Sequence, residues 1–424
     1  MTVAPLVCET TEIDQSAVLA LRSRAHSSGR VLERDGLLVV GLGVAVELGL
    51  PTGLADPTAV REAVAALAAI EGAKLAASNP VAAPIGIGAL PFDREAPGVI
   101  VVPEIAVVSA AGQRPQAILV GRPERLPALR AQLASSSEEV EPIEPGTLPD
   151  AFDLASTRSH DDFLRRVAAA VGEIRAGHVD KVVLAREVTV RANRPLVQRD
   201  LLGRLRSLHP SCLTFAVDGF IGATPELLLR RRGPQIASHP LAGTAARSGD
   251  AEADRRVEAA LLASDKERSE HRAVVDTIVA ALSPLVEQLT VPDRPEILEL
   301  RNVSHLGTPI AGLLAMSDRT LPSALDLVAL LHPTPAVAGT PLQSALECLA
   351  KLEDLDRDRY AGPVGWVDAA GDGEWHVGLR CALVDGSVAR LFAGVGIVAD
   401  SDPAAELAET QLKLQAFLAA AVRP

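Results

Sequence analysis

The chain has 424 residues, of which 48% are hydrophobic, so it can bury a large core as one big domain or as about two to three ordinary ones. Its 54 acidic residues outnumber its 41 Lys and Arg residues and give a net charge of −13, which leaves no basic stripe for a nucleic-acid backbone. Nucleic acid is therefore not an expected partner, and an anionic ligand must be met by a metal or by a few local basic groups.

Cysteine usage and the N-terminus indicate a reducing compartment. The chain has four cysteines, Cys8, Cys212, Cys348 and Cys381, and no two of them have Cys-x-x-Cys spacing. Neither a zinc site nor a disulfide framework is therefore predicted. The N-terminus lacks the basic and apolar regions of a signal peptide, and no apolar run approaches the roughly 18 residues that span a bilayer. We therefore expect a cytoplasmic protein without a membrane partner.

Residues 1–150 are rich in Ala, Val, Leu and Pro and carry few motifs, so we expect them to form a scaffold. The run Gly41-Leu42-Gly43-Val44 lacks the third small residue of a dinucleotide-binding fingerprint. Residues 135–146 combine Ser, Glu, Pro and Gly, which is typical of a surface connection.

Helix and strand patterns become clear after residue 155. Apolar residues at helical spacing predict a helix over 163–174, and a β-rich run predicts a strand over 181–190 that begins at Lys181. Asp218-Gly219 predicts a hairpin turn between strands 213–217 and 220–223. Hairpins followed by helices favour an α+β fold with antiparallel sheets over a doubly wound one.

A further strand is expected over residues 226–231. Glu226 follows Pro225, whose missing N–H is disfavoured within a central strand. This places Glu226 at the edge of the predicted strand.

Glu267 and Glu270 lie near the beginning of a helix that Ser283-Pro284 is expected to end. Residues three apart share one helix face, so the pair repels itself unless a cation is bound there. Taken alone, such pairs mostly decorate solvated helix faces. A metal site requires a second cluster to converge on this one.

Glu406 and Glu409 supply a matching pair on the last predicted helix. Asp402 can cap this helix, Pro403 takes its first position, and Lys413 follows Glu409 by one turn on the same face. Carboxylate oxygens on rigid helices suit Mg²⁺, which usually shares its coordination with waters and an anionic substrate. If the two pairs converge, they form a magnesium site.

Gly394 and Gly396 lie in a glycine-rich run before this helix. The run is followed by Asp400-Ser401-Asp402-Pro403, so the helix begins too late to place its N-terminus on a pyrophosphate. The glycines instead let backbone amides approach a ligand carboxylate, or relieve crowding in a strand.

Further motifs occur in a fixed order with the acidic pairs and Arg380: Pro240-Leu241-Ala242-Gly243-Thr244, Asn302-Val303-Ser304-His305-Leu306, His332-Pro333-Thr334-Pro335-Ala336-Val337-Ala338-Gly339-Thr340-Pro341 and Tyr360-Ala361-Gly362-Pro363-Val364-Gly365-Trp366. In this order the chain resembles the chorismate-utilising enzymes, which include anthranilate synthase component I, aminodeoxychorismate synthase, salicylate synthase and isochorismate synthase. The resemblance is dense over residues 155–424 and faint before them.

The resemblance implies one unit over residues 1–424, in which two orthogonally packed antiparallel β-sheets are covered by helices. Residues 1–150 would be its scaffold part and residues 155–424 its chorismate- and magnesium-binding part. By similarity, Glu270 and Glu409 would hold Mg²⁺ directly, Glu267 and Glu406 would hold its waters, and the ion would bind the ring carboxylate of chorismate.

The resemblance also implies a substrate site. Gly243, Thr244 and Gly394 would serve the ring carboxylate, and a clamp on the enolpyruvyl carboxylate would come from Arg380, Tyr360 and Gly396. His305, Ala336 and Lys413 also match positions that line the family's site. Taken singly, Arg380 could equally be a surface ion-pair residue and His305 a hydrogen-bonded core histidine.

Three positions separate the activities of the family. Lys181 stands where anthranilate synthases carry Gln, and a lysine there can take a proton from water if burial and its neighbours lower its pKa. Ala242 stands where aminodeoxychorismate synthases present a lysine nucleophile, so that covalent route is absent. Glu226 matches the general acid, which must be protonated to assist a leaving hydroxyl. The resemblance therefore implies an isochorismate synthase in which water attacks ring C2 and the C4 hydroxyl departs.

Two alternatives stay open. Salicylate synthases carry Thr three residues before the glycine matching Gly339, whereas this chain has Ala336, which disfavours pyruvate elimination. A non-catalytic chorismate-binding relative would be expected to lack a metal glutamate, Lys181 or Arg380, and all are present. The resemblance further implies a monomer without a glutamine amidotransferase subunit, and it does not separate menaquinone, siderophore and salicylate-derived pathways.

Overall fold

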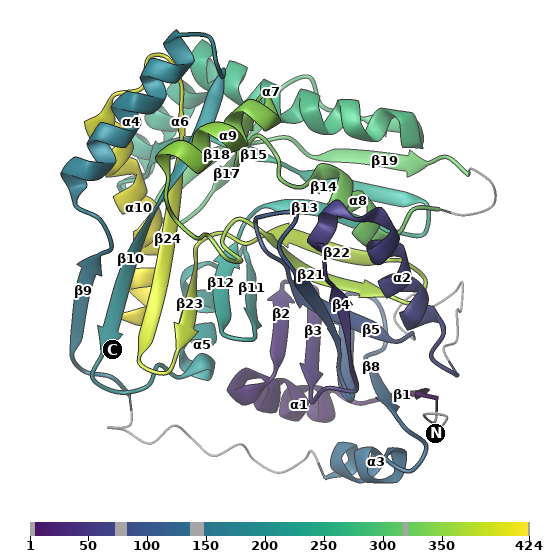
Figure 1. The fold of residues 1–424 in the computed structure, drawn as a ribbon. Coiled ribbons are helices and arrows are strands. Elements are labelled where there is room, and N and C mark those ends of the chain that lie inside the picture. The colour runs from purple at the N-terminus through teal and green to yellow at the C-terminus, as the bar shows by residue number, and fades with distance from the viewer. Residues whose placement is uncertain (1–4, 73–82, 136–147, 317–320, 423–424) are drawn as a thin grey trace.

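The computed structural model describes residues 5–72, 83–135, 148–316 and 321–422, which form an α+β fold of antiparallel sheets and helices (Figure 1). Apart from Ser135, the surface connection expected over residues 135–146 lies outside the described residues. No helix in these ranges is both long enough and apolar enough to cross a membrane.

The largest sheet has twelve strands, which range from β1 near the start of the chain to β24 near its end, with β2 paired to β11 from the middle of the chain. In spatial order its strands are β1 (Val7–Glu12), β8 (Gln116–Gly121), β7 (Ile105–Ala110), β3 (Leu37–Leu42), β2 (Arg30–Arg34), β11 (Leu213–Val217), β12 (Phe220–Thr224), β23 (Cys381–Asp385), β24 (Val388–Ile397), β10 (Lys181–Ala192) and β20 (Gly339–Thr340), with β9 (Phe152–Ser156) paired to β10.

A second sheet has nine strands and again joins the two ends of the chain, through the pairing of β5 with β21. Its strands in order are β16 (Val286–Thr290), β19 (Ile310–Leu314), β14 (Gln235–His239), β13 (Leu227–Arg232), β22 (Gly373–Val377), β21 (Pro363–Asp368), β5 (Ile85–Ala89), β6 (Gly98–Val102) and β4 (Val46–Leu50). In Figure 1, β10 and β24 of the first sheet run vertically, whereas β19, β21 and β22 of the second run across the view.

A small third sheet, which the sequence did not predict, carries part of the motif-rich region. It has three strands in the order β15 (Leu241–Ala246), β18 (Val303–Gly307) and β17 (Glu296–Glu299). Its pairing brings Thr244 opposite His305.

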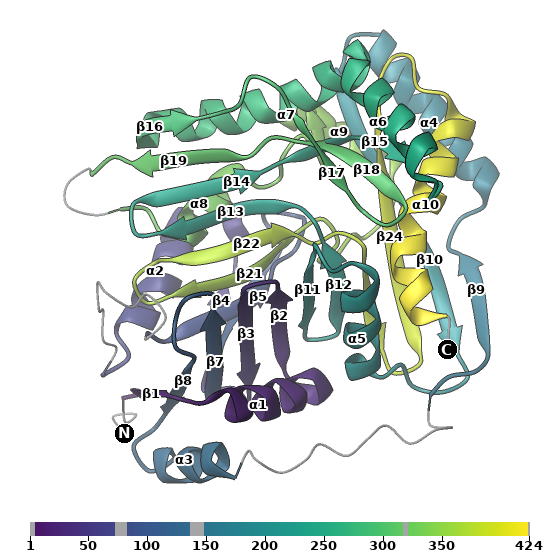
Figure 2. The ribbon, with the colours of Figure 1, turned by 180° about the vertical axis from the view of Figure 1, so that it is seen from behind.

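Helices cover the sheets, and α1, α5 and α10 lie over the face of the largest sheet seen in Figure 2. The helices are α1 (Gln15–Ser28), α2 (Pro57–Ala68), α3 (Leu126–Ala134), α4 (His160–Arg175), α5 (Gln198–Leu208), α6 (Ala251–Ala263), α7 (Asp265–Leu282), α8 (Ala324–Leu331), α9 (Leu342–Leu352) and α10 (Pro403–Ala421), with short 3-10 turns at Gly53–Ala55 and Ser283–Leu285.

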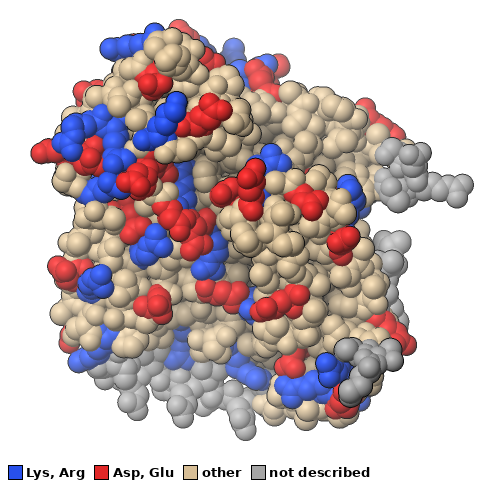
Figure 3. Space-filling model, viewed as in Figure 1, with Lys and Arg blue, Asp and Glu red and all other residues tan. Residues whose placement is uncertain are grey.

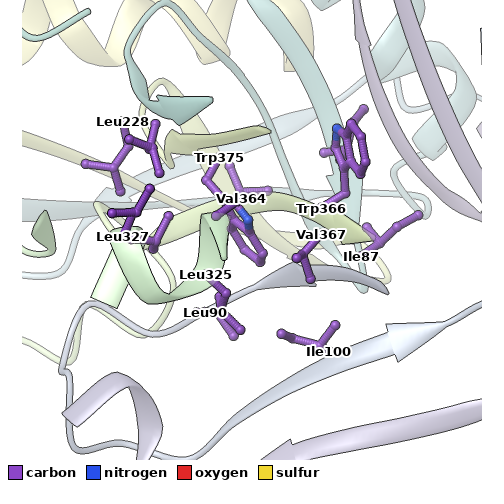
Figure 4. Close-up of a cluster of buried hydrophobic side chains, with 14 of the residues drawn as sticks. Ile87, Leu90, Ile100, Leu228, Leu325, Leu327, Val364, Trp366, Val367 and Trp375 are labelled. Carbon is purple, nitrogen blue, oxygen red and sulfur yellow. The ribbon is translucent and has the colours of Figure 1, made fainter. Parts of the chain in front are cut away.

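The main core joins the two large sheets. Figure 4 shows part of it, where Trp366 and Trp375 of the second sheet pack among aliphatic side chains such as Ile87 and Leu325. Both tryptophans are almost completely buried. Because each buries on the order of 200 Å², they anchor the interface between sheets and helices.

The local predictions for the chain after residue 155 are confirmed. The helix expected over 163–174 is α4, the strand expected to begin at Lys181 is β10, and Asp218-Gly219 turns between β11 and β12. The strand expected over 226–231 is β13, which begins at Leu227, one residue after Glu226. β13 pairs on both sides, so Pro225 lies just outside a central strand.

Candidate active site

One cavity gathers every residue that the sequence nominated for a site. It lies where β10, β24, α7, α10 and the small sheet meet, and it is partly open to solvent. Its lining includes Lys181, Glu226, Gly243, Thr244, Glu267, Glu270, His305, Ala336, Tyr360, Arg380, Gly394, Gly396, Glu406, Glu409 and Lys413. The two acidic pairs therefore converge, and the roles of the individual residues stay predictions.

Lys181 enters the cavity from the beginning of β10 and is 6% exposed. Its Nζ lies 2.6 Å from Oε1 of Glu270 on α7. β24 passes beside this ion pair, and a Cβ added to Gly396 would lie 2.8 Å from both Glu270 Oε1 and Lys181 Cε. Gly396 thus lacks a side chain because the ion pair occupies that space.

Glu226 lies in the short connection between β12 and β13, where Pro225 ends the pairing. Its side chain is 3% exposed, and its backbone is fixed by a bond from its N–H to Thr224 Oγ1 and by one from Val377 N–H to its carbonyl. Burial raises the pKa of Glu226 to about 8. The carboxyl group is therefore protonated at neutral pH and can donate a proton.

The tautomer of His305 is fixed by its partners. Its Nδ1 lies 3.0 Å from the Gly243 carbonyl oxygen, which can only accept, and its Nε2 lies 2.9 Å from Nη2 of Arg380, which can only donate. Nδ1 therefore carries the proton, and burial lowers the pKa of His305 to about 3. A neutral histidine thus holds the Arg380 guanidinium in place in the cavity.

Lys413 and Tyr360 lie on either side of Gly394. Nζ of Lys413 donates to the Gly394 carbonyl at 3.0 Å and pairs with Glu409 Oε1 at 2.7 Å. The Tyr360 ring stacks on Phe392 with a centroid distance of 5.2 Å, and a Cβ on Gly394 would lie 2.9 Å from the Tyr360 hydroxyl oxygen. This glycine lets the strand pass closely behind the tyrosine hydroxyl.

The four metal-candidate carboxylates repel one another in this arrangement. Burial and the neighbouring Glu270 raise the pKa of Glu267, and burial with the nearby Glu409 raises the pKa of Glu406 to about 7. Burial alone would raise the pKa of Glu409, but the Lys413 ammonium holds it below its usual range. These hard oxygen donors and their mutual repulsion fit a divalent cation.

The carboxylates do not already form a closed metal cluster. Across the described ranges, no group of three or more His, Cys, Asp or Glu side chains is placed to hold a metal ion. Two of the four glutamates, Glu270 and Glu409, instead bind lysines. A cation would have to draw them away from these partners.

Sequence reasoning missed two features of the site. Lys266 on α7 lines the cavity, and its charge acts against the raised pKa values of Glu267 and Glu406. In the sequence it resembles any exposed helix residue. The buried pair of Glu353 and Arg357 lies behind the cavity, where Arg357 donates to the Val183 and Val337 carbonyls.

Convergent carboxylates, a buried acid and a guanidinium thus meet at one cavity of this antiparallel α+β fold. The chain matches the family described as chorismate binding enzyme over residues 2–422, and it belongs to this family.

Its relatives include isochorismate synthases. It is 36% identical over 348 residues to the isochorismate synthase DhbC of Bacillus subtilis, with 80% of each chain covered. It is 36% identical over 340 residues to the isochorismate synthase EntC of Escherichia coli, covering 79% of this chain and 80% of the other. The solved structure of the menaquinone-specific isochorismate synthase MenF of Escherichia coli is similar with a TM-score of 0.81 and 26% identity, covering 99% of this chain and 96% of that one.

Proposed function

We propose that this protein is an isochorismate synthase, an isomerase that converts chorismate to isochorismate. Membership of the chorismate binding enzyme family and the similarity to isochorismate synthases over about 80% of the chain support this activity. The structural observation that carries the proposal is the buried protonated acid, Glu226, in the same cavity as the amine of Lys181 and the guanidinium of Arg380.

Lys181 would activate the attacking water. Its Nζ forms an ion pair with Glu270 in this structure, and only the uncharged amine, with a free lone pair, can accept a proton from water. A lysine base of this kind takes a proton from a water that attacks ring C2, which makes water the nucleophile and requires no ammonia.

Glu226 would act as the general acid. Because burial keeps its carboxyl group protonated, it can give its proton to the departing C4 hydroxyl while the double bond shifts. Isochorismate then forms with one water added and one released, so no redox cofactor is needed.

We propose Mg²⁺ as the cofactor, held by Glu270 and Glu409 with Glu267 and Glu406 beside them. When bound, it would neutralise and orient the ring carboxylate. The charges of the lining support this choice. The lining carries both signs of charge, because the four metal-candidate glutamates share the cavity with Lys181, Lys266, Arg380 and Lys413. A divalent cation and a dicarboxylate substrate would together add no net charge to it.

Arg380 would clamp the enolpyruvyl carboxylate together with Tyr360 and Gly396. A guanidinium presents a planar fork that matches a carboxylate, and His305 fixes its orientation through Nε2. Ala336 also lines the cavity and offers no hydroxyl to this end of the substrate, which favours isochorismate over further elimination to salicylate.

The deciding experiment separates chorismate, isochorismate and salicylate by chromatography after incubation with Mg²⁺ and without ammonia. We expect isochorismate alone, with no stoichiometric pyruvate in a coupled assay. Lys181→Ala and Glu226→Gln should each lower kcat by at least about 10²-fold while the circular dichroism spectrum is retained. Pyruvate release would instead identify a salicylate-forming enzyme, and chorismate binding without turnover would identify a non-catalytic relative.

We also propose that the protein acts in the cytoplasm as a monomer without a glutamine amidotransferase subunit. A reaction that uses water needs no ammonia-producing partner. Light scattering at several protein concentrations tests the oligomeric state directly.

A further inference from the structure

A second cavity lies at a gap in the edge of β10, away from the active site. β20 pairs only with Lys181 and Val182, and β9 pairs only from Val188 to Ala192. The β10 segment between these pairings borders the cavity, which the beginning of α4 and residues 353–355 also line.

The cavity is lined by the guanidinium group of Arg186, which is buried with N–H groups left unsatisfied by the described residues. Arg186 is 9% exposed, and its Nε and Nη1 are buried without a hydrogen-bond partner in the part of the chain that the structure describes. Side chains alternate along a strand, so Arg186 points to the α4 side of β10, opposite to Lys181 and Val183, which line the active site.

The acidic residues of the cavity are already paired with other cations. Four ion pairs account for them: Asp162 with Arg166, Glu187 with Arg390, Glu353 with Arg357, and Asp354 with Arg158. Arg186 therefore lacks a counter-charge, and burial lowers its pKa with no carboxylate acting in the other direction. A buried guanidinium in this state is costly unless an anion joins it.

The N-terminus of α4 adds donors that favour an anion. Ser159 caps the helix and binds the Asp162 N–H, while the N–H groups of His160 and Asp161 have no intrahelical partner. The positive end of the helix dipole lies at the same place, although Asp161 and Asp162 of the first turn already oppose it in part and Asp162 is paired with Arg166. Of the two N–H groups without an intrahelical partner, that of His160 belongs to a residue that lines the cavity. Figure 3 shows basic and acidic side chains intermixed on the face of the molecule that carries α4.

We propose that this cavity binds a small oxyanion, a phosphate or carboxylate group, whose oxygens accept hydrogen bonds from the Arg186 guanidinium beside the α4 N-terminus. The shared chemistry of the two groups is a compact charge with several acceptor oxygens, which matches the planar fork of arginine.

The test is isothermal titration of the full chain with inorganic phosphate and, separately, with acetate, in a buffer that contains neither. We expect at least one of the two anions to bind the wild-type chain, and Arg186→Gln to weaken this binding at least about tenfold. Arg191→Gln is the matched control, because Arg191 is exposed on the same strand. Arg380→Gln reports binding at the active site.

The outcomes separate clearly. Loss of binding in Arg186→Gln, with binding kept in Arg191→Gln and Arg380→Gln, supports the site, and the anion that binds tells phosphate from carboxylate chemistry. The proposal is overturned if neither anion binds the wild-type chain or if Arg186→Gln binds the anion as well as wild type does. It is also overturned if only Arg380→Gln loses anion binding. If Arg186→Gln does not fold, Arg186→Lys replaces it, and phosphate should raise the Tm of the wild-type chain more than that of the variant.

Discussion

At the scale of single residues, the proton on Glu226, the proposed general acid, makes the stability of the fold depend on pH. Its pKa is about 8 in the folded protein against 4.5 for an ordinary glutamate, so between these pH values the folded chain binds a proton that the unfolded chain lacks. Stability therefore falls as pH rises through this window. Glu226→Gln cannot ionise, and its free energy of unfolding relative to wild type should increase by up to about 1.4 kcal/mol per pH unit and level off above pH 8.

Urea unfolding of both proteins at about one-unit steps from pH 5 to pH 9 measures this difference. The control is Glu252→Gln on α6, because Glu252 is exposed. Its free energy of unfolding relative to wild type should not change with pH. A constant difference between Glu226→Gln and wild type would mean that Glu226 is ionised in the folded protein.

Gly396 allows a test of the space around Lys181. A methyl group there would lie 2.8 Å from Lys181 Cε and 3.3 Å from its Nζ, so Gly396→Ala must displace the lysine side chain itself. We expect kcat/KM to fall at least about tenfold while the free energy of unfolding changes by less than about 1 kcal/mol. Gly49→Ala on β4 is the control, since nothing lies within 4 Å of its added Cβ. Full activity in Gly396→Ala would show that Lys181 needs no fixed position.

The sequence predicted which residues meet at the cavity, but not how they pair. Ordered motifs were sufficient to nominate Lys181, Glu226 and both acidic pairs, and helical spacing correctly placed Lys413 beside Glu409. The ion pair of Lys181 with Glu270 joins segments far apart in the chain, and local spacing carries no information about such a contact.

At the scale of elements, a buried ion pair ties β10 to the segments around it. Glu353 accepts the Ala185 N–H and binds Arg357, which donates to the carbonyls of Val183 and Val337. In the sequence the pair resembles an ordinary exposed i,i+4 contact, which explains why it was missed. The contacts fix the strand that carries Lys181 and the loop that carries Ala336.

Removing Arg357 should therefore be costly. Arg357→Gln leaves Glu353 buried without its counter-charge, and we expect a loss of about 3–5 kcal/mol in the free energy of unfolding. Arg272→Gln provides the control, because Arg272 forms an exposed i,i+4 pair with Asp276 and should contribute at most about 0.5 kcal/mol. Equal losses in the two variants, measured by urea unfolding, would contradict a structural role for the buried pair.

Elements after residue 155 were more predictable than those before it. β10, β11, β12 and α4 show clear periodicity or turn signals. β8 is buried on both faces, so its sequence lacks the alternation that marks a half-exposed strand. The pairings of β2 with β11 and of β5 with β21 join distant segments and left no local signal.

At the scale of the whole molecule, the fold brings two remote helices to one charge cluster. α7 and α10 each contribute a carboxylate pair to the same cavity, and only the folded chain holds them together. A cation that binds this cluster therefore adds its binding energy to the stability of the fold. Mg²⁺ at about 100 times its Kd should raise the free energy of unfolding by roughly 2.7 kcal/mol, and EDTA should reverse the effect.

The metal prediction is tested by thermal unfolding with and without Mg²⁺, independently of turnover. Glu270→Gln and Glu409→Gln should abolish the rise in Tm, whereas Glu252→Gln on the exposed face of α6 should keep it. Activity should be lost with EDTA and restored with Mg²⁺ in the wild-type and Glu252→Gln proteins only. An equal rise in Tm in all four proteins would place the ion elsewhere on the surface, and the absence of any rise in the wild-type chain would remove the metal from the proposed site.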